Sequence, residues 1–169
     1  MNIWIPIEYK SSYSELPING LELCFADVEI DEELRRQYIK LCRWLRRNYW
    51  FPIKCKIVFE YYTCYMDSEN KSDRAIAIFY PPVDDKNGYM MAYPRIKIAV
   101  ADFEKDKNSY GLDDALEYYC NILIHELTHY YQWYFYETEQ RSKRSLEIEA
   151  NKYADAIVYI WQKNNKRKN

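Results

Sequence analysis

The chain has 169 residues, of which 30% are charged and 49% hydrophobic, and its formal net charge is −2. This length predicts one domain, residues 1–169, and the nearly balanced charge excludes a strong electrostatic attraction to nucleic acid or to anionic lipid. Only 3 residues are Gly whereas 19 are Tyr, a composition typical of an ordered fold with many half-buried phenols.

The cysteines and the first residues indicate the compartment. The five cysteines are odd in number and form no CxxC pair, which argues against a disulfide framework and against a thiolate zinc site, so we expect reduced thiols. The start of the chain lacks the basic and apolar regions of a signal peptide, and no apolar run approaches the roughly 20 residues of a membrane span. We therefore expect a soluble, cytoplasmic protein.

The first half of the chain predicts an irregular start, then a helix and a strand. Residues 1–30 hold short apolar stretches between turn sequences, which predicts at most one or two short strands. Asp31 is a suitable N-cap, and the apolar residues after it repeat with a helical period, so we predict a helix over 31–49. Its arginines lie mostly off the apolar stripe and indicate a solvated face. From residue 53 a period of two predicts a strand over 53–61.

The second half predicts further strands and then helices. A strand over 75–80 is followed by Asp-Asp-Lys-Asn-Gly at 84–88, which favours a tight hairpin turn and not a calcium loop. A strand over 95–100 leads through a polar connection, 102–111, to a helix over 112–136. A charged turn, a last helix from about residue 145 and a frayed tail at 163–169 complete the chain. This order predicts an α+β fold whose mainly antiparallel sheet is covered on one face by helices.

The helix predicted over 112–136 carries the sequence His-Glu-Leu-Thr-His, an HExxH motif that contains the only two histidines of the chain. Histidines four residues apart point to the same side of a helix, so His125 and His129 can reach one metal ion. Glu126 leans toward the same space, where a zinc hydrolase places its general base. Because no His or Cys follows His129, a third ligand from the rest of the chain must be a carboxylate.

The candidates for the third ligand can be narrowed to residues of the last helix. The downstream carboxylates are Glu137, Glu139, Glu147, Glu149 and Asp155. The first two would lie too far along the axis if the motif helix continued through them, and the last lies deep in the final helix. Glu147 and Glu149 flank the core-facing stripe on opposite sides; Glu147 is slightly nearer its centre, and the helical projection leaves both open. Asn151 lies one turn beyond Glu147, where its oxygen could accept a hydrogen bond from an imidazole.

These two segments together resemble the gluzincin metallopeptidases, which combine HExxH with ExxAD or ExxAN on a following helix. Residues 147–151 read Glu-Ile-Glu-Ala-Asn, and the continuation Ala-Asn-Lys-Tyr-Ala is similar to a stretch of the small ImmA/IrrE-type metallopeptidases. The resemblance covers only residues 112–158. It implies a zincin-like fold in which His125, His129 and Glu147 bind Zn²⁺ and Glu126 is the general base. Asn151 replaces the Asp of many gluzincins, so its neutral amide should polarise the imidazole less.

The expected function is a zinc-dependent endopeptidase acting on a protein or peptide, which the ImmA/IrrE resemblance implies to be a regulatory protein. The alternative is a non-catalytic zincin-like module that binds a partner and uses zinc structurally; Glu126 favours the enzyme, because a structural site needs no adjacent base. Donors for the oxyanion could be Tyr93, Tyr130 or Tyr153, and the sequence selects none. A substrate could add as a strand to a sheet edge, at residues 95–100 or at the hairpin strand before them.

Overall fold

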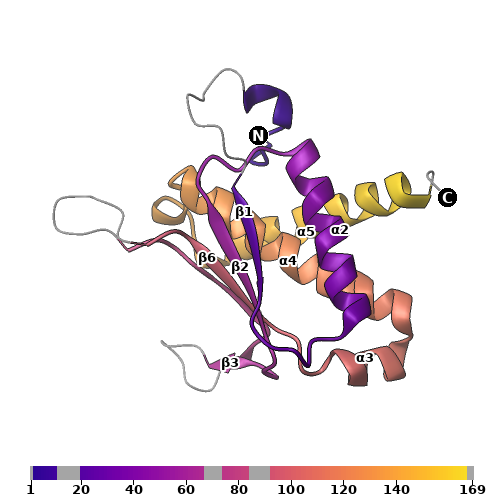
Figure 1. The fold of residues 1–169 in the computed structure, drawn as a ribbon. Coiled ribbons are helices and arrows are strands. Elements are labelled where there is room, and N and C mark those ends of the chain that lie inside the picture. The colour runs from indigo at the N-terminus through magenta and orange to yellow at the C-terminus, as the bar shows by residue number, and fades with distance from the viewer. Residues whose placement is uncertain (1, 11–19, 67–73, 84–91, 167–169) are drawn as a thin grey trace.

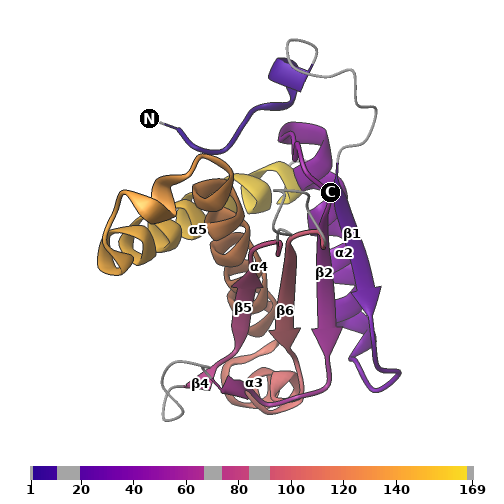
Figure 2. The same ribbon diagram turned by 90° about the vertical axis from the view of Figure 1, so that its left-hand side faces the viewer.

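Helices cover one face of a four-stranded sheet in the computed structural model of the chain, which describes residues 2–10, 20–66, 74–83 and 92–166 (Figure 1). The sheet has the order β1 (Leu21–Phe25), β2 (Cys55–Glu60), β6 (Arg95–Ala99) and β5 (Ala77–Tyr80), and β3 (Tyr65–Met66) pairs with β4 (Arg74–Ala75) beside it. The helices are η1 (Ile7–Tyr9), α2 (Glu32–Asn48), α3 (Phe103–Tyr110), α4 (Leu112–Tyr134), η2 (Glu137–Glu139) and α5 (Lys143–Lys166). Figure 2 shows the sheet face-on, with α2 and α4 behind it.

The α+β class with helices on one face is confirmed, but the prediction of a mainly antiparallel sheet is wrong. β1 pairs with β2 in parallel, β2 pairs with β6 in parallel, and only the edge strand β5 is antiparallel to its neighbour β6. The cause is α2, which connects β1 to β2; a helical crossover returns the chain to the same end of the sheet and makes the two strands parallel. A substrate strand at residues 95–100 is also excluded, because β6 already has a strand on each side.

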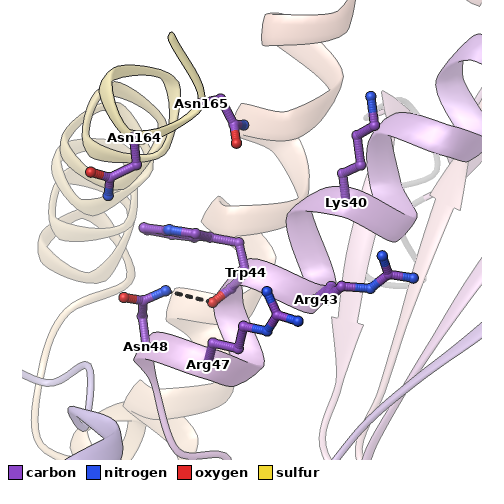
Figure 3. Close-up of a pocket in the computed structure, with 7 residues that line it drawn as sticks. All are labelled: Lys40, Arg43, Trp44, Arg47, Asn48, Asn164 and Asn165. Atoms are coloured by element: carbon purple, nitrogen blue, oxygen red, sulfur yellow. Dashed lines mark hydrogen bonds between the residues drawn. The ribbon is translucent and has the colours of Figure 1, made fainter. Parts of the chain in front are cut away.

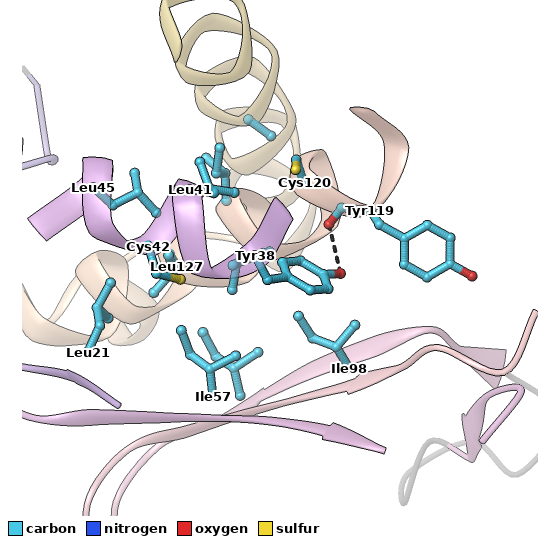
Figure 4. Close-up of a cluster of buried hydrophobic side chains, with 14 of the residues drawn as sticks. Leu21, Tyr38, Leu41, Cys42, Leu45, Ile57, Ile98, Tyr119, Cys120 and Leu127 are labelled. Carbon is cyan, nitrogen blue, oxygen red and sulfur yellow. Dashed lines mark hydrogen bonds between the residues drawn. The ribbon is translucent and has the colours of Figure 1, made fainter. Parts of the chain in front are cut away.

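The helix predicted over 31–49 is confirmed as α2. The side chain of Asp31 caps it by accepting hydrogen bonds from the backbone N–H groups of Glu33 at 2.8 Å and Leu34 at 3.1 Å. Its apolar stripe is fully buried, and Figure 4 shows Tyr38 of this stripe between α2 and the strand residues Ile57 and Ile98. The ring of Tyr38 stacks on that of Phe59 in β2, with the ring centroids 4.2 Å apart. Burial of this kind contributes about 1.5–3 kcal/mol per large aliphatic side chain.

The segment predicted as a polar connection over 102–111 is largely helical and forms α3. Only Gly111 separates α3 from α4, and its φ of 94° lies in a region that residues with a side chain rarely adopt. The chain can therefore turn sharply into α4 without an intervening loop. The motif helix predicted over 112–136 is confirmed as α4 and ends two residues early, at Tyr134.

The remaining predictions differ mostly at their boundaries. The strands predicted over 53–61 and 95–100 are confirmed as β2 and β6, whereas the strand predicted over 75–80 is divided between β4 and β5. The last helix, α5, starts at Lys143 and continues to Lys166, so residues 163–166 are helical and not frayed. The hairpin turn predicted at 84–88 lies outside the described residues. All five cysteines are free thiols, and Cys42, Cys55 and Cys120 are buried.

One hydrophobic cluster joins the sheet to the helices that cover it. It contains Ile3 and Trp4 near the start of the chain and reaches Ile157 and Trp161 on α5. The face of α4 that carries Ile124 and Leu127 is buried in this cluster, so the opposite face is the one presented to the edge strand β5. None of the described helices combines the length and the apolar character that crossing a lipid bilayer requires.

Candidate metal centre

Three predicted ligand residues converge between α4 and α5. The Nε2 atoms of His125 and His129 are 3.0 Å apart, and the Glu147 carboxylate lies 3.3 Å from the first through Oε2 and 3.4 Å from the second through Oε1. One potential ligand atom from each residue can be chosen so that all lie within 4.8 Å of one another. Ala150 and Ala154 on α5 are fully buried and small, which allows close packing of the two helices.

The outer hydrogen bonds of the two imidazoles fit a bound cation. His129 Nδ1 lies 2.7 Å from Gln132 Oε1, and His125 Nδ1 lies 3.0 Å from Asn151 Oδ1. Amide oxygens only accept hydrogen bonds, so each Nδ1 carries the hydrogen and each Nε2 offers a lone pair. Two lone pairs and a carboxylate then face one point, and a positive ion there satisfies all three. The arrangement of donors therefore suits a divalent metal held by His125, His129 and Glu147.

The protonation of the metal-free site agrees with this geometry. Burial opposes a charge on His125, but the hydrogen bond to Glu147 and the nearby Glu126 carboxylate outweigh it and raise the His125 pKa. Burial lowers the pKa of His129, and the positive charge of His125 lowers it further. The hydrogen bond from His125 lowers the pKa of Glu147. His125 and Glu147 therefore each favour the charged form of the other.

Glu149, the other carboxylate left open by the sequence, points away from this centre. Its Oε2 accepts hydrogen bonds from Arg141 Nη1 at 2.7 Å and from Gln132 Nε2 at 3.0 Å. Glu137 is likewise bound to Arg141, at 2.6 Å, and Asp155 accepts a hydrogen bond from Asn121 at 2.9 Å. Of the carboxylates considered from the sequence, the structure brings only Glu147 to the two histidines.

Glu126 lies next to the three ligand residues and is nearly buried, with 8% of its surface exposed. Burial raises its pKa to about 7, and the negative charge of Glu147 acts in the same direction. The charge of His125 and a hydrogen bond from the backbone of Phe79 on β5 lower the pKa and offset part of this rise. A carboxyl of this kind exchanges protons near neutral pH, which is the property that a general base requires.

A cleft of about 830 Å³ opens in front of these residues. The edge strand β5 forms one wall through residues such as Ile78 and Phe79, and α4 and α5 form the other through His129, Trp133 and Glu147. None of Tyr93, Tyr130 and Tyr153 lines this cleft. Tyr130 instead donates a hydrogen bond to the backbone oxygen of Ile53 at 2.8 Å, and Tyr153 accepts one from the backbone of Ile3 at 3.2 Å. The tyrosine that the described part of the cleft does contain is Tyr80, which the sequence did not single out.

Gln132 and Arg141 are further site residues that the sequence reading missed. Gln132 lies three residues after His129 on the same face of α4, and that spacing alone predicts a contact between the side chains. Arg141 lies four residues after Glu137 and eight before Glu149, but the sequence predicts a charged turn in this segment, so helical spacing does not predict these contacts.

A second concave region, of about 580 Å³, shares no lining residue with the cleft. It lies between α2 and the end of α5 and is lined by Lys40, Arg43, Trp44, Arg47, Asn48, Asn164 and Asn165 (Figure 3). Arg43 and Arg47 are exposed to solvent there. Their exposure agrees with the interpretation of the α2 arginines as a solvated face.

Comparison with known proteins adds no further constraint. The chain matches no model of a known protein family, no curated protein and no solved structure.

Proposed function

We propose that the chain is a zinc-dependent metallopeptidase of the zincin-like, gluzincin type that hydrolyses peptide bonds in a protein substrate. The observation that carries this proposal is the convergence of His125, His129 and Glu147 on one point beside the buried carboxyl of Glu126, at the base of a cleft. Two imidazoles and one carboxylate are a ligand set of catalytic zinc, which keeps a fourth position for water or substrate. The resemblance of residues 112–158 to gluzincins supports the same reading.

Different residues carry out different parts of the proposed reaction. Bound zinc would act as a Lewis acid toward water and toward the substrate carbonyl. Glu126 accepts the proton of the attacking water and delivers it to the leaving amine, a role for which its pKa of about 7 is suited. Asn151 and Gln132 hold the two imidazoles through their Nδ1 atoms, so that both Nε2 atoms face the ion.

An extended peptide is the form of substrate that the cleft accommodates. β5 is the last strand of the sheet order, so its outer edge faces the cleft and can pair with a substrate strand. A smaller hollow of about 360 Å³ shares Arg74, Ala77, His125 and Glu126 with the cleft. The groove therefore continues past the proposed zinc site, and a peptide lying along β5 extends on both sides of the bond to be cut.

Metal content tests the ligand set. We expect the purified wild-type protein to bind one equivalent of zinc, and we expect His125→Ala and Glu147→Ala each to lose it, because two remaining protein ligands bind zinc far more weakly. Glu139→Ala is a matched control, since Glu139 is an exposed carboxylate on η2 outside the cleft. Full zinc retention by Glu147→Ala would overturn the proposed third ligand.

Cleavage tests the role of Glu126. We expect Glu126→Gln to keep zinc and to lose about 10²–10⁴-fold in rate, because the amide cannot accept the proton of water. The measurement is the appearance of new peptide N-termini in an unfractionated protein mixture treated with wild type, with Glu126→Gln or with the control Glu139→Gln. Undiminished cleavage by Glu126→Gln would exclude it as the base. A zinc-loaded wild type that cuts nothing would favour the alternative, a binding module with structural zinc.

A further inference from the structure

The strongest unassigned feature is a chain of buried and half-buried polar groups behind His129. We propose that Gln132, Glu149 and Arg141, here called the Gln132 relay, are positioning residues that fix His129 in the tautomer able to bind metal through Nε2. This inference rests on the proposed metal site. It adds a function for three residues that are outside the proposed ligand set of His125, His129 and Glu147.

The first step of the relay is the orientation of the Gln132 amide. Gln132 is fully buried, and its Nε2 donates to two acceptors, the Leu146 backbone oxygen and Glu149 Oε2, each at 3.0 Å. Neither acceptor can donate a hydrogen bond when Glu149 is ionised, so the NH₂ group must face them. Gln132 Oε1 is therefore directed at His129 Nδ1, 2.7 Å away, and holds the hydrogen of the imidazole on Nδ1.

The second step is the position of Glu149. Its Oε2 accepts the hydrogen bond from Gln132 and also one from Arg141 Nη1 at 2.7 Å, so one oxygen atom joins both neighbours. Arg141 is held in turn by Glu137 Oε2 at 2.6 Å and by Ser145 Oγ at 2.9 Å. Hydrogen bonds between charged groups are about twice as strong as neutral ones. These hydrogen bonds connect the segment between α4 and α5 to the Gln132 amide, which in turn fixes the tautomer of His129.

The two histidines differ in how firmly the hydrogen-bond partner of Nδ1 is held. His125 Nδ1 has Asn151 Oδ1 as its partner, and Asn151 is exposed on α5. His129 has a fully buried partner whose own two donors are occupied. The side chain of Glu149 is only 22% exposed and that of Arg141 29% exposed, so water competes poorly for these bonds. His129 is therefore the ligand that is positioned before metal arrives.

Removal of the relay has a defined consequence. Without the Glu149 oxygen, the Leu146 backbone oxygen alone holds the Gln132 NH₂ group, so a fraction of the amide can rotate and present its NH₂ group to His129 Nδ1. In that fraction Nδ1 becomes an acceptor and the hydrogen moves to Nε2. An imidazole protonated on Nε2 cannot bind the ion through that atom. Glu149→Gln preserves the relay, because a single amide oxygen in the place of Oε2 can accept from both Gln132 and Arg141.

The test is zinc affinity, measured by competition with a chromophoric chelator. We expect Glu149→Ala to bind zinc about 10- to 100-fold more weakly than wild type, the usual effect of losing an outer hydrogen-bond partner of a metal ligand. Glu149→Gln should bind within a few-fold of wild type, and so should the control Glu139→Ala. Arg141→Gln, further from the core, should lose less than Glu149→Ala and replaces it if that variant does not fold.

A second readout needs neither metal nor activity. The chain has 2 histidines, so ¹⁵N-labelled imidazoles of the metal-free protein give a spectrum that a His125→Gln variant assigns. At pH 8 we expect wild-type His129 and the Glu149→Gln variant to carry the hydrogen on Nδ1. In Glu149→Ala a fraction with the hydrogen on Nε2 should appear, which a merely destabilised fold would not produce.

The outcomes separate the relay from the proposed function. Tight zinc binding by Glu149→Ala and Arg141→Gln with an unchanged His129 tautomer would overturn the relay and leave the zinc site intact. A wild type that binds no zinc while His129 responds as expected would overturn the metal site and leave the tautomer control intact. Equal weakening by Glu149→Ala and Glu149→Gln would show that charge matters and not the accepting oxygen, and would also overturn the relay.

Discussion

At the scale of single residues, Glu126 combines a charge with an environment that disfavours it. It is the one carboxylate among the residues described as buried, and burial together with Glu147 raises its pKa to about 7. A buried carboxyl destabilises the folded state once it is ionised, because the charge loses its hydration and does not gain enough hydrogen bonds or opposite charges in return. In the proposed function, this loss of stability accompanies a carboxyl that can accept a proton near neutral pH.

The raised pKa of Glu126 predicts that the stability of the metal-free protein depends on pH. Between the ordinary pKa of 4.5 and the folded value of about 7, the native state binds more protons at Glu126 than the unfolded state does. Stability should therefore fall as the pH rises through this window, by up to about 3 kcal/mol. Glu126→Gln removes this term, so it should gain stability relative to wild type between pH 5 and pH 8. Denaturation of both proteins across this pH range, with a chelator present, measures their free energies of unfolding. A difference between the two free energies that does not change with pH would contradict the shifted pKa of Glu126.

At the scale of elements, the end of α4 decides where the rest of the site lies. α4 ends at Tyr134, and Tyr136 then adopts φ 57°, a left-handed conformation in which glycine is the favoured residue. Tyr136 is 68% exposed, so its ring contributes little burial. The turn carries the chain through η2 toward α5, the helix that contains Glu147.

A substitution at this turn should be stabilising. We expect Tyr136→Gly to raise the free energy of unfolding by about 0.5–1 kcal/mol, since glycine adopts positive φ without the steric cost of a side chain. Tyr136→Val should lower it, because a branched Cβ is least suited to this conformation. Tyr159→Gly serves as the contrast, as Tyr159 is similarly exposed, at 56%, but lies inside α5, where glycine is unfavourable. Thermal melts of the metal-free variants give the comparison.

Elements whose signals are local could be predicted from the sequence, and pairings between distant segments could not. The N-cap and stripe of α2 and the HExxH spacing on α4 are encoded within a few turns of helix, and the structure has them as predicted. The parallel pairing of β1 with β2 joins residues on either side of α2, so the alternation of apolar and polar residues within each strand does not predict its direction. For the site, helical projection could not separate Glu147 from Glu149; Arg141, which binds Glu149, decides between them.

At the scale of the whole molecule, the proposed zinc site joins α4 to α5 on one side while the start of the chain joins them on the other. Trp4 Nε1 donates to Thr128 Oγ1 of α4 at 3.1 Å, and the backbone of Ile3 donates to the hydroxyl of Tyr153 on α5 at 3.2 Å. Thr128 belongs to the HExxH motif and is fully buried on the side that faces the core. The start of the chain thus holds the motif helix on its core side, and Glu147, the proposed third ligand, contacts both histidines from α5.

Zinc should therefore stabilise the entire fold. A ligand that binds only the native state adds about 2.7 kcal/mol at a free concentration of 100 times its Kd. We expect the melting temperature of wild type to rise with added zinc and to fall with a chelator, and we expect Glu147→Ala to respond to neither. Calorimetric melts at fixed protein concentration measure this. A zinc response of Glu147→Ala equal to that of wild type would place the ion elsewhere.

The positions of the ligands along the chain bear on the order of folding. His125, His129 and Glu147 lie on consecutive helices, whereas the sheet is closed by pairings such as Leu21 with Cys55 and Lys56 with Arg95. Contacts between nearby segments form faster than parallel pairings across long stretches of chain. We expect a refolding chain to assemble the α4–α5 pair first and to complete the sheet, with its edge strand β5, later. The protein would then acquire the ability to take up metal before it has a groove in which to hold a peptide.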